Sequence, residues 1–374
     1  MRGKARPQTD MAFLVNLEEL VERDHPLREV KRMCQEVLES LEGELAQMYA
    51  PKGRPSVPPE RLLMAWVLMC LYGVRSCRRF AADLRYNLLY KWFLDMNPDE
   101  TAFDHSSFSQ NMERFEKHRV SELVFAEVVE LARRRGWISD EHFSVDGTLI
   151  EAWASLKSFR PKDEPPPPPG GDRNDWVDFK AQKRSKQTHA STTDPQARLA
   201  RKGFGKEARL CFGMHAVGEN RSGLLVKLDV QAACGEGNSE AEVASKQLDG
   251  LAMLGFGVRS VGADKGYHTR EFVQGCRDRG IAPHVACVRG RKTPGLDGRT
   301  TRSKAYRTSQ RIRKRIEEPF GWMKTAGHFR KTRWRGIDRT HFMAQFFGSA
   351  CNLLRMAKMA ATENVKPPGT VVAA

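Results

Sequence analysis

The sequence lacks the signatures of several protein classes. Its eight cysteines are scattered singly through 374 residues, with no CxxC pair. That distribution argues against a disulfide framework or a zinc knuckle and suggests a reducing cytosol. No HExxH motif is present, so a histidine-bound zinc centre is not expected. The GxxxxGK[ST] loop of ATP-binding proteins is also missing, because a glutamate follows Lys206 in the short glycine loop at 203–206.

Long hydrophobic runs are missing as well. The longest extends from Leu62 to Val74, which is shorter than the ~20 residues needed to span a bilayer and predicts a buried helix. The amino terminus has basic residues but no apolar segment, so no secretory signal is expected. We therefore expect a cytoplasmic protein with no membrane partner.

Acidic residues are outnumbered by basic ones. The chain has 62 Lys and Arg against 46 Asp and Glu, a formal net charge of +16. Such an excess favours a polyanionic partner, because every phosphate that a cation neutralises releases condensed counterions. The basic residues are also clustered, which favours nucleic acid over general solubility as their role.

The length and the pattern of the chain predict two domains. Residues 1–136 read as all-helical, with apolar residues at helical spacing after Pro26 and again after Pro59. The polar segment 104–110 opens a helix, either as a simple cap or as a helix that lies in a DNA groove. Residues 137–360 form the second domain, with a proline-rich insert at about 160–193. The tail, 361–374, is expected to be disordered.

The second domain alternates between strand and helix patterns. This order predicts an α/β fold, a mixed sheet with flanking helices. In such a sheet, acids at strand ends converge at one edge, where ligands bind. Strands are predicted at residues 142–146, 210–217, 223–230, 258–263 and 281–285, and helices at 239–254, 270–279, 310–324 and 338–358.

Three acids form a candidate catalytic set. Asp146 ends the first predicted strand, Asp264 follows the strand at 258–263, and Glu317 lies on a later helix. Three unpaired carboxylates would repel one another without a cation, and hard oxygen ligands suit Mg²⁺ or Mn²⁺. Two such ions can activate an attacking oxygen and stabilise a leaving one in phosphoryl transfer. A turn-forming role is the alternative for either aspartate.

The helix that carries Glu317 places cations around it. Arg313 precedes Glu317 by four residues and Lys324 follows it by seven, so all three share one face. These cations would contact phosphates, or alternatively pair with the glutamate. Glu318 lies about 100° around the helix and is the weaker candidate. Pro319 lacks an N–H and predicts a bend just past Glu317.

A basic and aromatic segment surrounds this helix. Residues 302–335 contain twelve Lys or Arg and two acids, with tryptophans interleaved. Such a mixture suits a nucleic-acid surface with base stacking. The alternatives are a core role for the tryptophan and a solvated basic face. The predicted DNA-binding residues are Arg313, Arg315, Lys324, Lys331, Arg333, Arg335 and Trp322.

Together these segments resemble a DDE transposase of a bacterial insertion sequence, close to the insertion sequence five family. The similarity covers most of residues 10–358. The family's signature is tyrosine, two residues, arginine, three residues, glutamate, six residues, lysine. Arg313, Glu317 and Lys324 fit it, and Gln310 holds the tyrosine position, where its amide could donate to a phosphate. The matching segments are RDHPLREV, SVDGTLIEAWAS, TTDPQARLARKGFGKEARL, GADKGYHT and RIRKRIEEPFGWMKTAGHFRKTRWRG.

The resemblance implies a ribonuclease H-like catalytic domain that binds two Mg²⁺ ions through Asp146, Asp264 and Glu317. It also implies an enzyme that cuts at terminal inverted repeats and joins the freed 3′-OH ends to target DNA, as a homodimer or larger assembly. The alternatives are a ribonuclease H-like nuclease without strand transfer, and a non-catalytic DNA-binding derivative.

Overall fold

The computed structural model describes residues 16–50, 52–53, 55–162, 188–203 and 205–365. The run of five prolines in the predicted insert and the last nine residues lie outside this part of the chain. Two short strands, β2 (Phe159–Pro161) and β3 (His189–Ser191), flank the insert and pair with each other. The closing helix continues to Val365, five residues into the predicted tail.

The amino-terminal part is helical, as predicted. Pro26 and Pro59 each occupy the first turn of a helix, where a missing N–H costs nothing. The helix predicted near residue 104 begins at Ser106, after Asp104 Oδ1 accepts the Ser106 N–H at 2.8 Å. The helices are α1 (Leu17–Leu20), α2 (Pro26–Ser40), α3 (Glu42–Gln47), α4 (Pro59–Leu71), α5 (Cys77–Leu84), α6 (Leu88–Phe93), α7 (Ser106–Lys117) and α8 (Val120–Arg134).

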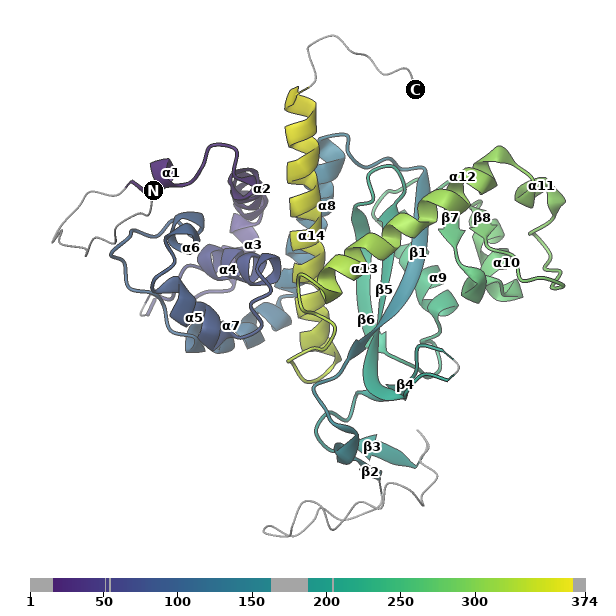
Figure 1. Cartoon of the computed structure of the whole chain (residues 1–374), viewed down its shortest axis with the longest axis horizontal. Helices are drawn as coiled ribbons and strands as arrows, with labels where there is room; N and C mark the ends of the chain where they lie inside the picture. The colour runs from purple at the N-terminus through teal and green to yellow at the C-terminus, as the bar shows by residue number, and fades with distance from the viewer. Residues whose placement is uncertain (1–15, 51, 54, 163–187, 204, 366–374) are drawn as a thin grey trace, which may run out of the picture.

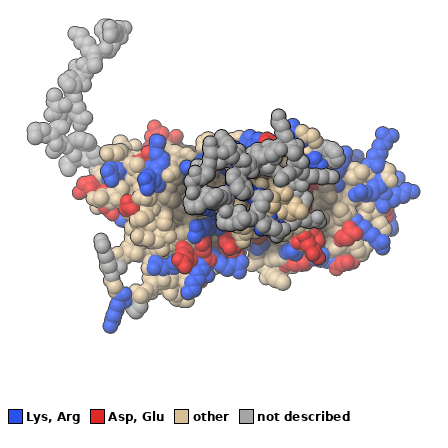
Figure 2. All heavy atoms as spheres, turned by 90° about the horizontal axis from the view of Figure 1, so that it is seen from below, with Lys and Arg blue, Asp and Glu red and all other residues tan. Residues whose placement is uncertain are grey.

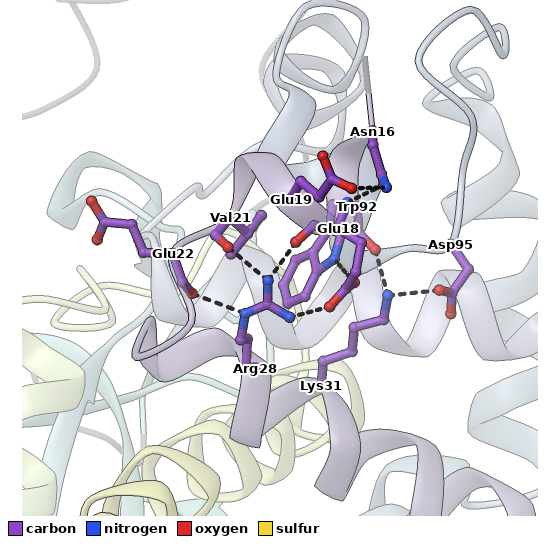
Figure 3. A network of polar contacts seen from close by, with 9 residues as sticks. All are labelled: Asn16, Glu18, Glu19, Val21, Glu22, Arg28, Lys31, Trp92 and Asp95. Carbon is purple, nitrogen blue, oxygen red and sulfur yellow. Dashed lines mark hydrogen bonds and ion pairs between the residues drawn. The ribbon is translucent and has the colours of Figure 1, made fainter. Parts of the chain in front are cut away.

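A polar network ties three of these helices together (Figure 3). Arg28 on α2 donates to Glu18 and to the Val21 carbonyl oxygen at 2.6 Å. Trp92 on α6 donates from Nε1 to Glu18 at 2.6 Å. Lys31 on α2 donates to the Trp92 carbonyl oxygen at 2.7 Å. These bonds hold the short α1 against α2 and α6, although α1 has no buried residue of its own.

Within the described residues, the second part is built on a six-stranded mixed sheet (Figure 1). β1 runs antiparallel to β5 and parallel to β7, β7 runs parallel to β8, and β4 and β6 both pair with β5. This is the ribonuclease H-like mixed sheet with flanking helices that the sequence predicts, and the fold class is confirmed. The strands are β1 (His142–Glu151), β4 (Arg198–Ala200), β5 (Arg209–Glu219), β6 (Leu225–Ala232), β7 (Ser260–Ala263) and β8 (Ala282–Val285).

The three helices predicted at 239–254, 270–279 and 338–358 begin close to their predicted starts, whereas the helix predicted from residue 310 begins at Lys304. α9 (Glu240–Met253) and α10 (Arg270–Asp278) follow β6 and β7. The helix predicted at 310–324 is divided into α12 (Lys304–Ile312), a 3₁₀ segment η3 (Arg313–Ile316) and α13 (Glu317–Lys324). The remaining helices are η1 (Leu156–Ser158), η2 (Lys265–Tyr267), α11 (Gly298–Thr301) and α14 (Ile337–Val365).

The long helix α14 packs between the helical part and the sheet (Figure 1). Its Phe342 and Phe346 contact Trp66 of α4, with ring centroids 6.1 and 6.3 Å apart. Gln345 of α14 donates to the Leu228 carbonyl oxygen of β6 at 2.6 Å. The buried residues of both parts form one continuous hydrophobic core. The division at residue 136 stays a prediction and falls in the connection between α8 and β1.

Candidate active site

Asp146 and Asp264 are neighbours because of strand register. β1 and β7 run parallel, and their last paired residues are Ser144 and Gly262. Two residues further on, Asp146 continues β1 and Asp264 follows the end of β7. Adjacent strands lie about 4.8 Å apart, and residues two apart share a face. The two aspartates therefore lie side by side at the carboxyl end of β7.

Each aspartate is held by a nearby backbone amide. Asp146 Oδ1 accepts the N–H of Gly147 at 2.8 Å. Asp264 caps η2 and accepts the N–H of Gly266 at 2.7 Å. These local bonds use one oxygen of each carboxylate and orient the side chain. Within the described residues, neither aspartate forms an ion pair with Lys or Arg.

The helical segments α12, η3 and α13 carry Glu317 across the sheet, in front of β1 (Figure 1). A glycine allows this close approach. A side-chain carbon at Gly262 of β7 would lie 3.2 Å from Arg313 Cβ, whereas one at Gly218 of β5 would make an ordinary contact with Ile316 at 3.5 Å. Ile316 is buried directly before Glu317. Packing on these strands therefore fixes where α13 begins.

The helical path is irregular beside Glu317. The 3₁₀ segment η3 ends at Ile316, and Pro319 is buried in the first turn of α13. Pro319 has no N–H, so it cannot donate the α-helical hydrogen bond to the carbonyl oxygen of Arg315. A 3₁₀ turn is the tighter alternative to the α-helical turn that this hydrogen bond would close. The predicted irregularity is present, but it precedes Glu317 rather than following it.

The rival carboxylate, Glu318, is engaged elsewhere. Arg355 on α14 donates from Nη1 to Glu318 Oε2 at 2.9 Å. Arg355 also donates to the Ser222 carbonyl oxygen at 2.5 Å. Glu318 therefore helps to hold α13 on α14, whereas Glu317 acts electrostatically on Asp146.

The charges of the other two acids act on Asp146. The pKa of Asp146 is raised to about 6, mainly by burial and also by the charges of Asp264 and Glu317. The Gly147 amide and the Arg313 guanidinium act in the opposite direction and lower this pKa. A carboxylate that resists ionisation beside two other acids is the expected signature of a site that needs a cation.

A fourth acid, Glu240, stands close to this set. Partial burial raises the pKa of Glu240, and the charges of Asp146 and Asp264 raise it further. Glu240 was not predicted as a site residue. The glycine-rich segment before it and the Ser239 cap indicate a helix start, but neither signal says that this helix begins beside the two aspartates.

Lys324 contacts β1 next to Asp146. Its Nζ donates to Thr148 Oγ1, and Thr148 shares a face of β1 with Asp146. The pKa of Lys324 is lowered to about 8, mainly by burial and also by the cations Lys202 and Arg330. Lys324 and Glu317 are predicted to share one face of the helix. The bond to Thr148 places Lys324 against the strand that carries Asp146.

Three other predicted DNA-binding residues have partners within the protein. Gln310 Nε2 donates to the His284 carbonyl oxygen, at the end of β8. Arg313 Nε donates to Gln310 Oε1 at 3.1 Å. Arg315 Nη1 donates to the carbonyl oxygens of Asn220 and Arg221 at 3.0 and 2.7 Å. These bonds hold α12 and η3 on the sheet.

The remaining predicted DNA-binding residues lie after α13. Lys331 and Arg333 flank the ring of Trp153, at 5.3 and 5.2 Å from its centroid. Trp153 is 39% exposed and was not predicted as a site residue. Arg335 is exposed. Trp322 is half-buried and packs against the core.

The donor set fits a hard divalent cation by its chemistry, because carboxylate oxygens are the preferred ligands of Mg²⁺ and Mn²⁺. In the part of the chain that the structure describes, no three Asp, Glu, His or Cys side chains are already gathered closely enough to hold an ion. Asp146 and Asp264 each keep an oxygen that their backbone bonds leave available. Metal binding would therefore turn these side chains toward a shared point.

Two family models match the chain. The Transposase DDE domain matches residues 139–353, which contain the sheet and all three predicted acids. A Transposase domain model matches residues 15–114 in the helical part. The chain belongs to the DDE transposase family, the class of enzymes that cut and join DNA. It is a DNA transposase, as the resemblance predicts, while membership of the insertion sequence five family in particular stays a prediction.

Solved structures with distant similarity include two transposases bound in DNA assemblies. The piggyBac transposase synaptic complex with hairpin DNA is 8% identical, with 92% of this chain and 77% of that chain covered and a TM-score of 0.42. A pre-cleavage Mos1 transpososome is 11% identical, with 85% and 83% covered and a TM-score of 0.21. TM-scores this low carry no argument about this chain. No curated protein matches the sequence.

Proposed function

We propose that this transposase cuts DNA at the terminal inverted repeats of an insertion sequence and joins the freed 3′-OH ends to target DNA. The observation that carries the proposal is the approach of Asp146, Asp264 and Glu317. These residues lie 118 and 53 positions apart along the chain, yet both of the other acids raise the pKa of Asp146. The match of the DDE domain to residues 139–353 supports the same reaction.

In this proposal Asp146, Asp264 and Glu317 hold two Mg²⁺ or Mn²⁺ ions. When bound, such ions supply an activated attacking oxygen and neutralise charge on the phosphoryl and leaving oxygens. The Gly147 and Gly266 amides keep the two aspartates oriented. Packing of α12 and η3 over the sheet keeps Glu317 close enough to act electrostatically on Asp146.

Lys324 and Arg313 bind the phosphates on either side of the cleaved bond. Lys324 supplies a compact charge at Thr148, next to Asp146, and can exchange this weak neutral partner for a phosphate oxygen. The guanidinium of Arg313, held by Gln310, has donors left for a forked contact. In this arrangement Gln310 supports Arg313. Its amide contacts DNA only if it releases the carbonyl oxygens at the strand ends.

The DNA partner follows from the family and from charge. Figure 2 shows Lys and Arg side chains gathered at the end of the molecule where Figure 1 shows α11. Residues 289–307 contain seven exposed cations and one acid, Asp297. We propose that this surface and the helical part, residues 1–136, hold the transposon ends, and that two chains assemble on DNA so that both ends are cut together. The exposed cations are Arg289, Arg291, Lys292, Arg299, Arg302, Lys304 and Arg307.

The test uses double-stranded DNA that carries the inverted repeats flanking the gene, with and without Mg²⁺. Wild type is compared with Glu317→Gln, and the matched control is Glu318→Gln, which removes the adjacent charge. We expect Glu317→Gln to lower cleavage by about 10³-fold or more, because the metal loses a ligand. Glu318→Gln should stay within several-fold of wild type, since Glu318 contacts Arg355.

The products distinguish the rival functions. Joined strand-transfer products support a transposase reaction, and cleavage without joining supports a nuclease of the same fold. If Asp146→Ala and Glu317→Gln leave every DNA product and Mg²⁺ binding unchanged, the chain is a non-catalytic DNA-binding derivative. Equal losses in Glu317→Gln and Glu318→Gln would contradict the assignment of Glu317.

A further inference from the structure

Glu240 is the first residue of α9, and this helix start is rigid. Ser239 Oγ accepts the Glu242 N–H at 3.3 Å, and Glu242 Oε2 accepts the Ser239 N–H at 3.0 Å, which completes a capping box. Gln247, two turns on, donates to the His215 carbonyl oxygen of β5 at 3.0 Å. Because Glu242 caps the helix, Glu240 is free for another role.

The carboxylate of Glu240 lies between the two aspartate loops. A side-chain carbon at Gly147, next to Asp146, would lie 3.0 Å from Glu240 Oε1. A side-chain carbon at Gly266 would lie 3.5 Å from Glu240 Oε2 and 3.0 Å from Asp264 Oδ1. Oxygens of Glu240 and Asp264 thus approach one point, and the absence of a side chain at Gly147 leaves room for the Glu240 carboxylate.

No partner within the protein accounts for this position. Among the described residues, the side chain of Glu240 takes part in no hydrogen bond or ion pair. A second polar group points to the same place: Nδ1 of the buried His215 has no hydrogen-bond partner in the described chain. This atom lies 3.0 Å from the position that a side-chain carbon at Gly147 would occupy, and Glu240 Oε1 approaches the same position. Glu240, His215 and Thr148 line one cavity of about 340 Å³.

The geometry points to Glu240 as a fourth carboxylate ligand of the metal site, an oxygen donor to a divalent ion held by Asp146 and Asp264. This inference rests on the metal-dependent reaction proposed above and adds a ligand that the three-acid set does not contain. A different role for an acid at a helix start is stabilisation of the helix dipole. That role requires neither the approach to Gly147 and Gly266 nor the unpartnered His215.

The test measures Mn²⁺ binding by the full-length protein without DNA, by titration calorimetry and by the electron paramagnetic resonance of free Mn²⁺. The variant is Glu240→Gln, and the matched control is Glu271→Gln, an exposed acid in the first turn of α10. Asp146→Asn reports on the site itself. We expect Glu240→Gln to weaken Mn²⁺ binding tenfold or more and Glu271→Gln to leave it unchanged.

Thermal unfolding without metal separates the two roles of Glu240. A dipole role predicts that Glu240→Gln lowers the midpoint and leaves Mn²⁺ binding unchanged. A ligand role predicts an unchanged or higher midpoint, because one of several like charges is removed. If Glu240→Gln does not fold, Glu240→Asp keeps the charge but retracts it by one methylene, and it should weaken Mn²⁺ binding severalfold.

The outcomes separate this inference from the proposed function. Wild-type affinity in Glu240→Gln or in Glu240→Asp, alongside a loss in Asp146→Asn, would overturn the fourth ligand and leave the three-acid site intact. Undetectable Mn²⁺ binding by wild type would overturn both. A loss in Glu240→Gln and Asp146→Asn, but not in Glu271→Gln, supports both.

Discussion

Lys324 on α13 donates a hydrogen bond to Thr148 on β1, two residues beyond Asp146 on the same strand face. This contact joins the helix that carries Glu317 to the strand that carries the first aspartate. It also places a lysine whose pKa is lowered to about 8 next to an acid whose pKa is raised to about 6. Both shifts arise mainly from burial, so the site holds groups that titrate near neutral pH.

The first prediction concerns the loss of DNA-cleavage activity at alkaline pH, which is the alkaline limb of the pH profile. The lowered pKa of Lys324 means that the free enzyme loses this charge as pH rises through about 8. We expect kcat/KM for DNA cleavage to fall above that pH, because this parameter reports the free enzyme. Lys324→Arg, which stays charged, should move the limb upward. Lys324→Gln should lower kcat/KM by about 10–100-fold below pH 8, with a smaller difference above it, because the wild-type lysine is charged only below that pH. Lys314→Gln, an exposed neighbour, should leave kcat/KM unchanged. If Lys324→Arg leaves the pH of this decline unchanged, the decline arises from the titration of another group.

The second prediction concerns stability without metal. The pKa of Asp146 is about 6 in the folded protein, whereas its ordinary value is 3.8. As pH falls from about 6 to 4, the folded chain binds a proton that the unfolded chain does not, so stability from this group rises. Above pH 6 the ionised Asp146 is destabilising. Asp146→Asn should therefore unfold a few degrees higher than wild type at pH 7.5 without Mg²⁺, with a smaller difference at pH 4.5.

Mg²⁺ supplies the control for this measurement. It should raise the unfolding midpoint of wild type at pH 7.5, because it binds the folded state alone, and leave Asp146→Asn nearly unchanged. Differential scanning calorimetry checks both expectations. A lower midpoint for Asp146→Asn at pH 7.5 in the absence of metal would show that the carboxylate stabilises the fold instead.

The third prediction uses two glycines. A methyl group at Gly147 would lie 3.0 Å from both Glu240 Oε1 and His215 Nδ1, so Gly147→Ala must shift these two side chains by a few tenths of an ångström. We expect about tenfold weaker Mn²⁺ binding with little loss of stability. Gly321 lies inside α13 with open space around it. Gly321→Ala should raise the free energy of unfolding by about 0.5–1 kcal/mol and leave Mn²⁺ binding unchanged. Calorimetry measures both quantities, and equal Mn²⁺ affinities in the two variants would contradict the crowding argument.

The fourth prediction concerns DNA binding beyond the metal site. Trp153 is exposed and flanked by Lys331 and Arg333, an arrangement suited to base stacking. Trp153→Ala should weaken binding to transposon-end DNA by about tenfold, since one stacked base contributes ~1–3 kcal/mol. Tyr86, which is 80% exposed, provides the control in Tyr86→Ala. Fluorescence anisotropy at one fixed salt concentration measures both, and equal affinities would remove Trp153 from the DNA surface.

Much of the fold followed from local patterns. Alternation at 142–146, the helical spacing after Pro59, and the acid after each of two strands all depend on neighbours a few residues away. The predicted starts of α4, α9 and α10 are therefore close to the observed ones. The roles of Gln310 and Arg315 were harder to predict from the sequence, because their partners are distant along the chain. Gln310 contacts Ala263, 47 residues away, and Arg315 contacts Asn220, 95 residues away.

The sequence by itself determined the order of strands and helices, the basic character of the chain and the three acids, because each is a matter of composition or short-range spacing. Only the tertiary structure decided that Asp146 and Asp264 are adjacent, since this depends on the register of β1 against β7. It also decided the place of Glu240, because Gly147, which is distant in sequence, leaves room for its carboxylate.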